Sequence, residues 1–248
     1  MEQITIGYLS WKRNDVFEQT LKSHQQNGLF DLISPSNRII FFQETSQQDI
    51  ELARRYNCEY ISSKTNIGIL GAFIQLVKAC RTEYFIFSEN DWNLIENKEK
   101  MYKILQDSIV LCDKNIIVKL RHRENPGKPL YSKPVDVNNW LSQDISGFPY
   151  KLESLSWIKN PEDYYKLQEL EIVQLNYKWY VCTLEHQRWS NNIFICRTSL
   201  LKDKLEEIGS FDNLDKYTGL EDVLINHVKL NVKIAGGDGL FTHLDYIL

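Results

Sequence analysis

Apolar runs separated by polar segments divide the first half of the chain into predicted strands and helices. A short apolar run that ends in polar residues is typical of a buried strand, whereas apolar residues three or four apart are typical of a helix. The sequence predicts strands over residues 4–10, 38–43, 58–62 and 84–87, with a helix between each pair. Strands that alternate with helices indicate an α/β fold with a mainly parallel central sheet and right-handed crossovers.

Local signals predict where the connecting helices begin. Asn14 or Asp15 can cap the first helix, and His24 falls on its predicted apolar face. Ser46 can cap the second helix. The third helix follows a loop that contains Gly68, where a glycine permits a positive φ or a close approach of the backbone.

The pattern is weaker in the second half of the chain. A helix is predicted over residues 96–112 and a strand over 116–120, but residues 121–150 are polar and contain four prolines. Shorter apolar runs return over residues 171–173, 179–182, 193–195, 232–235 and 240–244, and helices are predicted over 199–208 and from Leu220 onward. No internal repeat or linker divides the chain, so we expect one domain over residues 1–248.

Composition and charge narrow the class of protein. The 248 residues are 43% hydrophobic and 25% charged, as in ordinary globular proteins. The net charge of -4 offers no basic footprint for a nucleic acid, and no segment is apolar for long enough to span a membrane. The first residues lack the pattern of a signal peptide, and the five scattered cysteines favour neither a disulfide framework nor a zinc site. We therefore expect a cytoplasmic protein.

Two acidic residues after one predicted strand supply the first candidate chemistry. Glu89 and Asp91 follow the apolar run 84–87, with Asn90 between them. The carboxyl end of a strand is where open α/β sheets bind ligands. Carboxylate oxygens suit Mn²⁺ or Mg²⁺, which retain open positions for phosphate oxygens. The two acids either share one divalent ion that faces a diphosphate or belong to an ordinary polar turn.

Five motifs follow one another in a distinctive order. They are Asn66-x-Gly68-x-x-Gly71-Ala72, the stretch 83–91 that ends in Glu89-Asn90-Asp91, Ser190-Asn191-Asn192-Ile193-Phe194, Gly219-Leu220-Glu221-Asp222, and Phe241-Thr242-His243. Their order resembles that of the GT-A glycosyltransferases, in particular the family-2-like inverting enzymes. The small size of the chain is similar to that of compact enzymes of this class from bacteria and large viruses. Residues 121–178 match no part of the family.

The resemblance implies that the chain transfers a sugar from a nucleotide-diphosphate sugar, of the UDP, GDP or dTDP type, to a glycan or another hydroxyl acceptor. It implies a nucleotide-sugar half over about residues 1–120 and an acceptor half over about residues 121–248. Asp91, Glu89 and His243 would hold Mn²⁺ or Mg²⁺, and Asp222 would remove the acceptor proton with Glu221 as its orienting partner. The residues expected to contact the donor are Ser10, Arg13, Glu44, Asn66, Gly68, Glu89, Asn90 and Asp91.

Each assignment has a structural alternative. Glu221 and Asp222 could stabilise the start of a helix through its dipole. Arg13 and Glu44 could be solvated loop charges, as could the basic run over residues 121–123. Two other functions also fit the same α/β pattern: a catalytically inactive module that binds a nucleotide or carbohydrate, and a sugar nucleotidyltransferase. Residues 10–14 contain no glycine, which argues against the phosphate loop that a nucleotidyltransferase requires.

Overall fold

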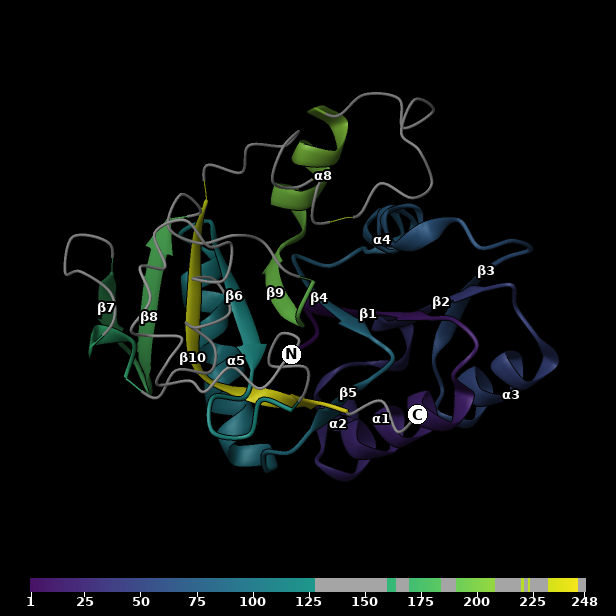
Figure 1. The fold of residues 1–248 in the computed structure, drawn as a ribbon, viewed down its shortest axis with the longest axis horizontal. Helices are drawn as coiled ribbons and strands as arrows, with labels where there is room; N and C mark the ends of the chain where they lie inside the picture. Colours follow the sequence, from purple (N-terminus) through teal and green to yellow (C-terminus); the bar gives the residue numbers. More distant parts are fainter. Residues whose placement is uncertain are drawn as a thin grey trace, which may run out of the picture.

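A ten-stranded sheet runs through the computed structural model, which describes residues 1–127, 160–163, 170–183, 191–207, 220, 223 and 232–244. The strands lie in the order β3-β2-β1-β4-β9-β6-β10-β8-β7, and β5 pairs with β10 beside this path (Figure 1). Their bounds are β1 (Ile4–Ser10), β2 (Arg38–Gln43), β3 (Glu59–Ser63), β4 (Tyr84–Glu89), β5 (Trp92–Leu94), β6 (Ile116–Arg121), β7 (Glu171–Gln174), β8 (Lys178–Thr183), β9 (Phe194–Arg197) and β10 (Lys233–His243).

Helices cover both faces of this sheet. They are α1 (Asn14–Gln26), α2 (Leu29–Leu32), α3 (Gln47–Arg55), α4 (Gly68–Ala79), α5 (Lys98–Cys112) and α8 (Thr198–Glu207), with short 3-10 turns η1 (Pro35–Asn37) and η3 (Pro161–Asp163). Apolar residues of α1, α3 and α5 pack on one face, and those of α4 and α8 pack on the other. Figure 1 shows α4 and α8 above the strands and α1 and α2 below them. None of the described helices is long and apolar enough to cross a membrane.

The first half of the chain forms the parallel sheet that its pattern predicts. β1 pairs in parallel with β2 and β4, and β2 pairs in parallel with β3. Helix α3 begins at the predicted cap, because the Ser46 hydroxyl accepts from the Asp49 N–H and the Asp49 carboxylate accepts from the Ser46 N–H. The predicted caps Asn14 and Asp15 are wrong, since α1 already begins at Asn14 and Arg13 holds the cap position, where its side chain makes no capping bond.

The second half of the chain inserts an antiparallel strand between parallel ones. β9 pairs antiparallel with both β4 and β6, and β10 pairs in parallel with β6. The two predicted runs over residues 232–235 and 240–244 belong to one strand, β10, whose register with β6 shifts between Gly236 and Phe241. Gly239 lies in this shift with a φ of +73°, and a Cβ atom there would lie 1.9 Å from the Arg121 carbonyl oxygen. Glycine is therefore required for the close approach of these two strands.

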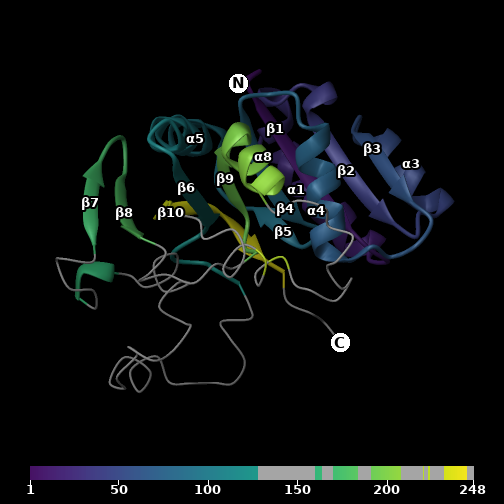
Figure 2. The ribbon, with the colours of Figure 1, turned by 90° about the horizontal axis from the view of Figure 1, so that it is seen from above.

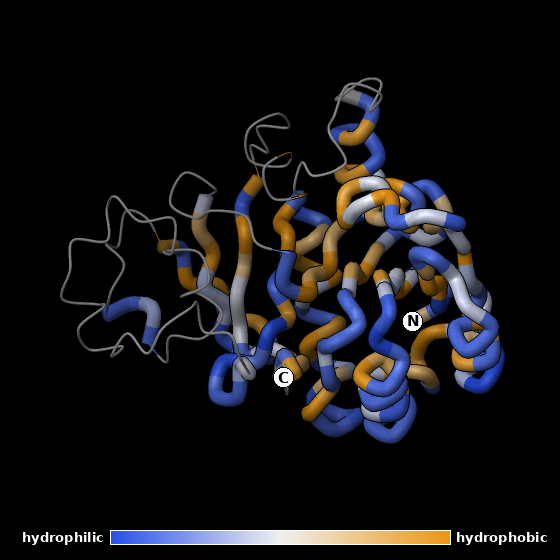
Figure 3. Tube along the Cα trace, turned by 45° about the vertical axis from the view of Figure 1, so that its right-hand side comes forward, coloured by the Kyte–Doolittle hydropathy of each residue, from blue (hydrophilic) through white to orange (hydrophobic). Residues whose placement is uncertain are grey.

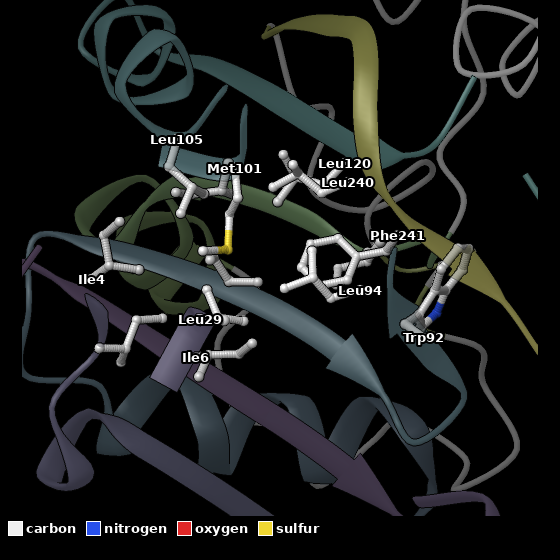
Figure 4. Close-up of a cluster of buried hydrophobic side chains, with 14 of the residues drawn as sticks. Ile4, Ile6, Leu29, Trp92, Leu94, Met101, Leu105, Leu120, Leu240 and Phe241 are labelled. Carbon is white, nitrogen blue, oxygen red and sulfur yellow. The ribbon is translucent and has the colours of Figure 1, made fainter. Parts of the chain in front are cut away.

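The largest apolar cluster joins the two halves of the sheet. Hydrophobic residues concentrate in the strands, whereas hydrophilic residues predominate on the outer turns of the helices (Figure 3). Trp92 and Leu94 of β5 and Phe241 of β10 belong to the same buried cluster as Ile6 of β1 and Met101 of α5 (Figure 4). The three-residue strand β5, which the pattern of the sequence does not predict, is therefore a part of the core.

The β7–β8 hairpin lies at the opposite edge of the sheet from β3 (Figure 2). Asp107 of α5, which is 2% exposed, anchors its turn. The Asp107 carboxylate accepts hydrogen bonds from Asn176 N at 3.2 Å, Asn176 Nδ2 at 2.7 Å, Tyr177 N at 2.9 Å and Trp179 Nε1 at 3.0 Å. Four donors on one buried carboxylate satisfy its charge without a basic partner among these contacts.

Candidate functional site

The strands place polar residues along one edge of the sheet. The parallel strands β1, β2, β4, β6 and β10 end at this edge, and the antiparallel strand β9 begins there. Ser10 ends β1, Glu44 follows β2, Glu89 ends β4, Asn192 lies just before β9 and His243 ends β10. Because the carboxyl ends of parallel strands are the usual ligand sites of such sheets, this edge is the candidate functional site.

Asp91 lies between two side chains from distant parts of the chain. Arg13 Nη1 donates to Asp91 Oδ2 at 2.9 Å, and His243 Nε2 lies 3.4 Å from Asp91 Oδ1. The Asp91 side chain is only 5% exposed, and Oδ1 is buried without a hydrogen bond from any described residue. Since buried polar atoms normally have a partner, this oxygen could accept a cation. The fold thus brings together three of the predicted site residues.

The Asp91–His243 pair fits a divalent cation, but Glu89 does not join it. Two ligand atoms about 2.1 Å from an octahedral ion lie about 3 Å apart, which is close to the observed separation of 3.4 Å. Glu89 follows Phe85 and Phe87 of β4 at two-residue spacing, so its side chain lies on the face of the sheet that α4 covers. In the described part of the chain, no three His, Cys, Asp or Glu side chains gather around one point.

The turn that carries Asp91 is tied to the end of β1. β4 ends at Glu89, so Asn90 and Asp91 lie beyond the strand. Asn90 Nδ2 donates to Ser10 Oγ at 3.3 Å, and both residues are buried. Ser10 and Asn90, which the family resemblance assigns to binding of the nucleotide sugar, are therefore hydrogen-bonded to each other beside Asp91.

A second group of predicted residues lies beyond the ends of β1 and β2. The Glu44 carboxylate pairs with Lys12 Nζ and accepts from Trp11 Nε1 at 3.1 Å, and these bonds hold the pKa of Glu44 below its ordinary value. Lys12 and Glu44 have φ angles of 52° and 51°, in a region that residues other than glycine seldom adopt. Trp11 is 45% exposed, so its indole presents an apolar ring to solvent beside the carboxylate.

Asn66 and Gly68 lie next to Glu44 at the start of α4. A hydrogen bond from the Asn66 backbone also lowers the pKa of Glu44. Gly68 N donates to Asn66 Oδ1 at 2.8 Å, and Ile67 N donates to Gln43 Oε1 at 2.7 Å. Gly68 has a φ of +78°, which is the positive angle that a glycine permits. The start of α4 is thus joined to the end of β2.

The basic run that begins at the last residue of β6 is buried, so the alternative that it consists of solvated charges is wrong. Arg121, His122 and Arg123 are each less than 9% exposed. Arg121 donates to the carbonyl oxygens of residues 126 and 127 and lies over the Trp92 ring. His122 Nε2 donates to Glu96 Oε1 at 2.8 Å, since His122 Nδ1 accepts from the N–H groups of residues 124 and 125.

The proposed catalytic pair, Glu221 and Asp222, lies outside the described residues, as does Ser190 of the motif before β9. The residues on either side of the pair, Leu220 and Val223, are described, and both are buried in the apolar cluster on the α4 face. The assignment of Asp222 as a base stays a prediction.

Trp92 also lies in the candidate site, and the sequence did not predict it there. Its ring packs edge-on against His243, with 4.8 Å between ring centroids and 74° between ring planes. The guanidinium carbon of Arg121 lies 5.6 Å from the centroid of the same Trp92 ring. The position of an aromatic residue directly after Glu89-Asn90-Asp91 is the signal that could have drawn attention to it.

The comparisons with known proteins rest on solved structures, since no family model and no curated protein sequence matches the chain. TarS of S. aureus, in complex with UDP-GlcNAc, matches 99% of this chain and 59% of its own, with 14% identity and a TM-score of 0.57. The mannosyltransferase PcManGT from Pyrobaculum calidifontis, in complex with GDP-Man and Mn²⁺, matches 99% of this chain and 57% of its own, with 10% identity and a TM-score of 0.54.

The chain thus spans about three fifths of these two solved chains, of which the TarS one comprises residues 1-349, and 37% of a longer solved TarS chain. At such low identity the likeness concerns the fold, and it extends over nearly the whole of this chain. It agrees with the order of motifs in the sequence and with the mixed sheet, whose central strands are mostly parallel. The chain has the GT-A-like glycosyltransferase fold.

Proposed function

We propose that the chain binds a nucleotide-diphosphate sugar at the carboxyl edge of its sheet and transfers the sugar to a hydroxyl acceptor. One observation carries this proposal. A buried carboxylate oxygen, Asp91 Oδ1, lies without a hydrogen bond beside His243 at the site where this fold would place a diphosphate. The complexes of TarS with UDP-GlcNAc and of PcManGT with GDP-Man and Mn²⁺ support a donor of this class.

The residues around Asp91 have distinct proposed roles. Asp91 and His243 would hold Mn²⁺ or Mg²⁺, which stabilises the charge of the departing diphosphate as a Lewis acid when it is bound. Arg13 already contacts Asp91 Oδ2, and its guanidinium can donate two parallel hydrogen bonds to phosphate oxygens. Glu89, on the α4 face, is proposed to contact the ribose or a metal-bound water rather than the ion directly.

The nucleoside is proposed to lie over the ends of β1 and β2. Glu44 is the acceptor for an N–H of the base or a hydroxyl of the ribose, and the exposed ring of Trp11 is a surface on which a base can stack. Asn66 and Gly68 border this position from the start of α4. The left-handed backbone of Lys12 and Glu44 supports a functional role here, because strain of this kind concentrates at ligand sites.

The acceptor half is proposed to supply the base. Asp222, oriented by Glu221, would remove the proton of the attacking hydroxyl in a single inverting displacement. The resemblance of residues 219–222 to the family motif supports this role, and the flanking residues Leu220 and Val223 are buried in the apolar cluster on the α4 face.

Thermal unfolding with UDP, GDP and dTDP, each with and without Mn²⁺, tests the proposal. We expect one nucleotide to raise the unfolding temperature, with a larger shift when Mn²⁺ is present, and we expect Asp91→Asn to remove the Mn²⁺-dependent part. Lack of any response would contradict nucleotide binding. Release of the nucleoside diphosphate from its sugar in the presence of an acceptor separates a transferase from an inactive binding module. Formation of a nucleotide sugar from a nucleoside triphosphate and a sugar phosphate would favour a nucleotidyltransferase instead.

A further inference from the structure

Helix α1 presents a row of polar side chains to the segment that contains Asp91. The row consists of four residues that lie on one side of the helix because they are three or four positions apart: Thr20, Ser23, His24 and Asn27. Their partners are backbone groups of residues 90, 92 and 94. Thr20 Oγ1 donates to Asn90 O at 3.0 Å, His24 Nε2 donates to Trp92 O at 2.8 Å, Asn27 Nδ2 donates to Leu94 O at 2.8 Å, and Ser23 Oγ accepts from Leu94 N at 3.0 Å.

The backbone of this segment alternates between two neighbours. The even-numbered residues bond to α1 and its C-cap, whereas the odd-numbered residues bond to β10 and the residue after it: Leu244 N donates to Asp91 O at 2.8 Å, and Ile95 N donates to Leu240 O at 3.1 Å. β5 also pairs antiparallel with β10, which places His243 opposite Trp92. Asp91 is therefore held by β10 at its own carbonyl and by α1 at the residues before and after it.

His24 makes the central bond of this row, and its chemistry allows only one arrangement. A carbonyl oxygen cannot donate, so the bond to Trp92 O requires a hydrogen on His24 Nε2. His24 Nδ1 then accepts from the Tyr8 hydroxyl, which lies 2.7 Å away. Burial lowers the pKa of His24 to about 4 and raises the pKa of Tyr8, so both groups keep these roles at neutral pH. The ring also packs edge-on against Phe241 of β10, with 5.2 Å between centroids.

We propose that His24 is a positioning residue that sets the separation of Asp91 and His243 through the Trp92 carbonyl. Trp92 follows Asp91 in the chain, lies opposite His243 in the β5–β10 pair and contacts the His243 ring. A single hydrogen bond at Trp92 O therefore restrains both side chains at once. The effect on ligand affinity rests on the proposed function, whereas the effect on the geometry of the segment does not.

Two substitutions of similar polarity separate this role from simple packing. In His24→Gln, the side-chain amide nitrogen reaches the place of the imidazole Nε2 and can still donate to Trp92 O. In His24→Asn, the shorter side chain reaches only the place of Nδ1, so it can meet Tyr8 but not Trp92. Both variants leave a defect in the core, and the defect in the asparagine variant is larger by about one methylene group. A packing role therefore destabilises β2 and the segment around Asp91 together in each variant, while a positioning role loosens that segment relative to β2 in the asparagine variant alone.

Hydrogen exchange of the ligand-free protein is the first readout. The Leu244 amide, bonded to Asp91 O, and the Ile95 amide report on the restrained segment, and the amides of β2 report on global unfolding. Relative to β2, exchange at Leu244 and Ile95 should be about tenfold faster in His24→Asn, as the loss of one buried hydrogen bond predicts, and close to wild type in His24→Gln. Equal acceleration in both variants would overturn the proposal.

The second readout is the affinity for Mn²⁺ and for the nucleotide that stabilises the wild-type protein most. We expect His24→Asn to weaken both by about tenfold and His24→Gln to retain them within about threefold, since tenfold corresponds to one hydrogen bond. Normal affinity in His24→Asn would contradict positioning even if exchange changes. If the wild-type protein binds neither ligand, the proposed function fails, and the exchange rates alone decide whether His24 restrains Asp91.

Discussion

Replacement of Arg13 by methionine should change the affinities for the metal and for the nucleotide in opposite directions. Arg13 Nη1 lies 2.9 Å from Asp91 Oδ2, while the other oxygen, Oδ1, faces His243. A cation bound between Asp91 Oδ1 and His243 would therefore share its carboxylate with a guanidinium. Without Arg13, this competition is removed, so Mn²⁺ alone should bind more tightly. The nucleotide should bind more weakly in the presence of Mn²⁺, because its phosphates lose a positive partner.

The size of the effect follows from the ion pair. Two unit charges about 4 Å apart interact by about 4 kcal/mol at an effective dielectric constant of about 20. The Arg13 side chain is 26% exposed and that of Asp91 is 5% exposed, so solvent screening reduces the interaction to about 1–2 kcal/mol. This corresponds to about a tenfold change in the Kd of Mn²⁺.

Titration calorimetry at low ionic strength measures both affinities, and Lys12→Met is the matched control. Lys12 is the neighbouring residue and carries the same charge, but it pairs with Glu44 rather than Asp91. We expect Lys12→Met to leave the Mn²⁺ affinity unchanged. Equal changes in the two variants would mean that only the overall charge matters. Weaker Mn²⁺ binding by Arg13→Met would refute the reasoning, because Arg13 would then organise Asp91 for the ion.

Three further predictions concern stability. Because burial lowers the pKa of His24 from 6.5 to about 4 in the folded chain, the unfolded chain binds more protons between pH 6.5 and pH 4. The free energy of unfolding should therefore fall by about 3 kcal/mol over this range, and denaturant unfolding of His24→Leu should show little of this pH dependence. Asp107→Asn should cost about 2–4 kcal/mol, because it leaves donors of the β7–β8 turn without acceptors; an unchanged denaturation midpoint would contradict this anchor. Gly239→Ala should cost about 3 kcal/mol or more in the same assay, since its φ is positive and its Cβ would meet the Arg121 carbonyl, whereas Gly71→Ala, with no contact below 3.3 Å, should cost far less.

Much of the candidate site follows from strand ends that can be recognised in the sequence. Ser10, Glu44, Asn90 and Asp91 follow apolar runs, and parallel strands bring such residues to one edge. The association of Asp91 with His243 was expected only from the resemblance, since more than a hundred residues separate them in the chain. The sequence did not distinguish the orientation of Glu89 from that of Asp91, because the exact end of β4 decides which face each side chain takes.

The local pattern of the chain by itself determined the parallel strands β1 to β4, the helices α1, α3 and α4 and the Ser46 cap of α3, but not the short helix α2. These features depend on periodicity and on hydrogen bonds between residues a few positions apart. Only the tertiary structure decided that β9 enters between β4 and β6, that β5 joins the core, and that His24 bonds to Trp92 O rather than packing as an ordinary apolar residue. Periodicity states which side of an element is buried, but the partner on that side comes from another part of the chain, and its identity is set by how all the layers fit together.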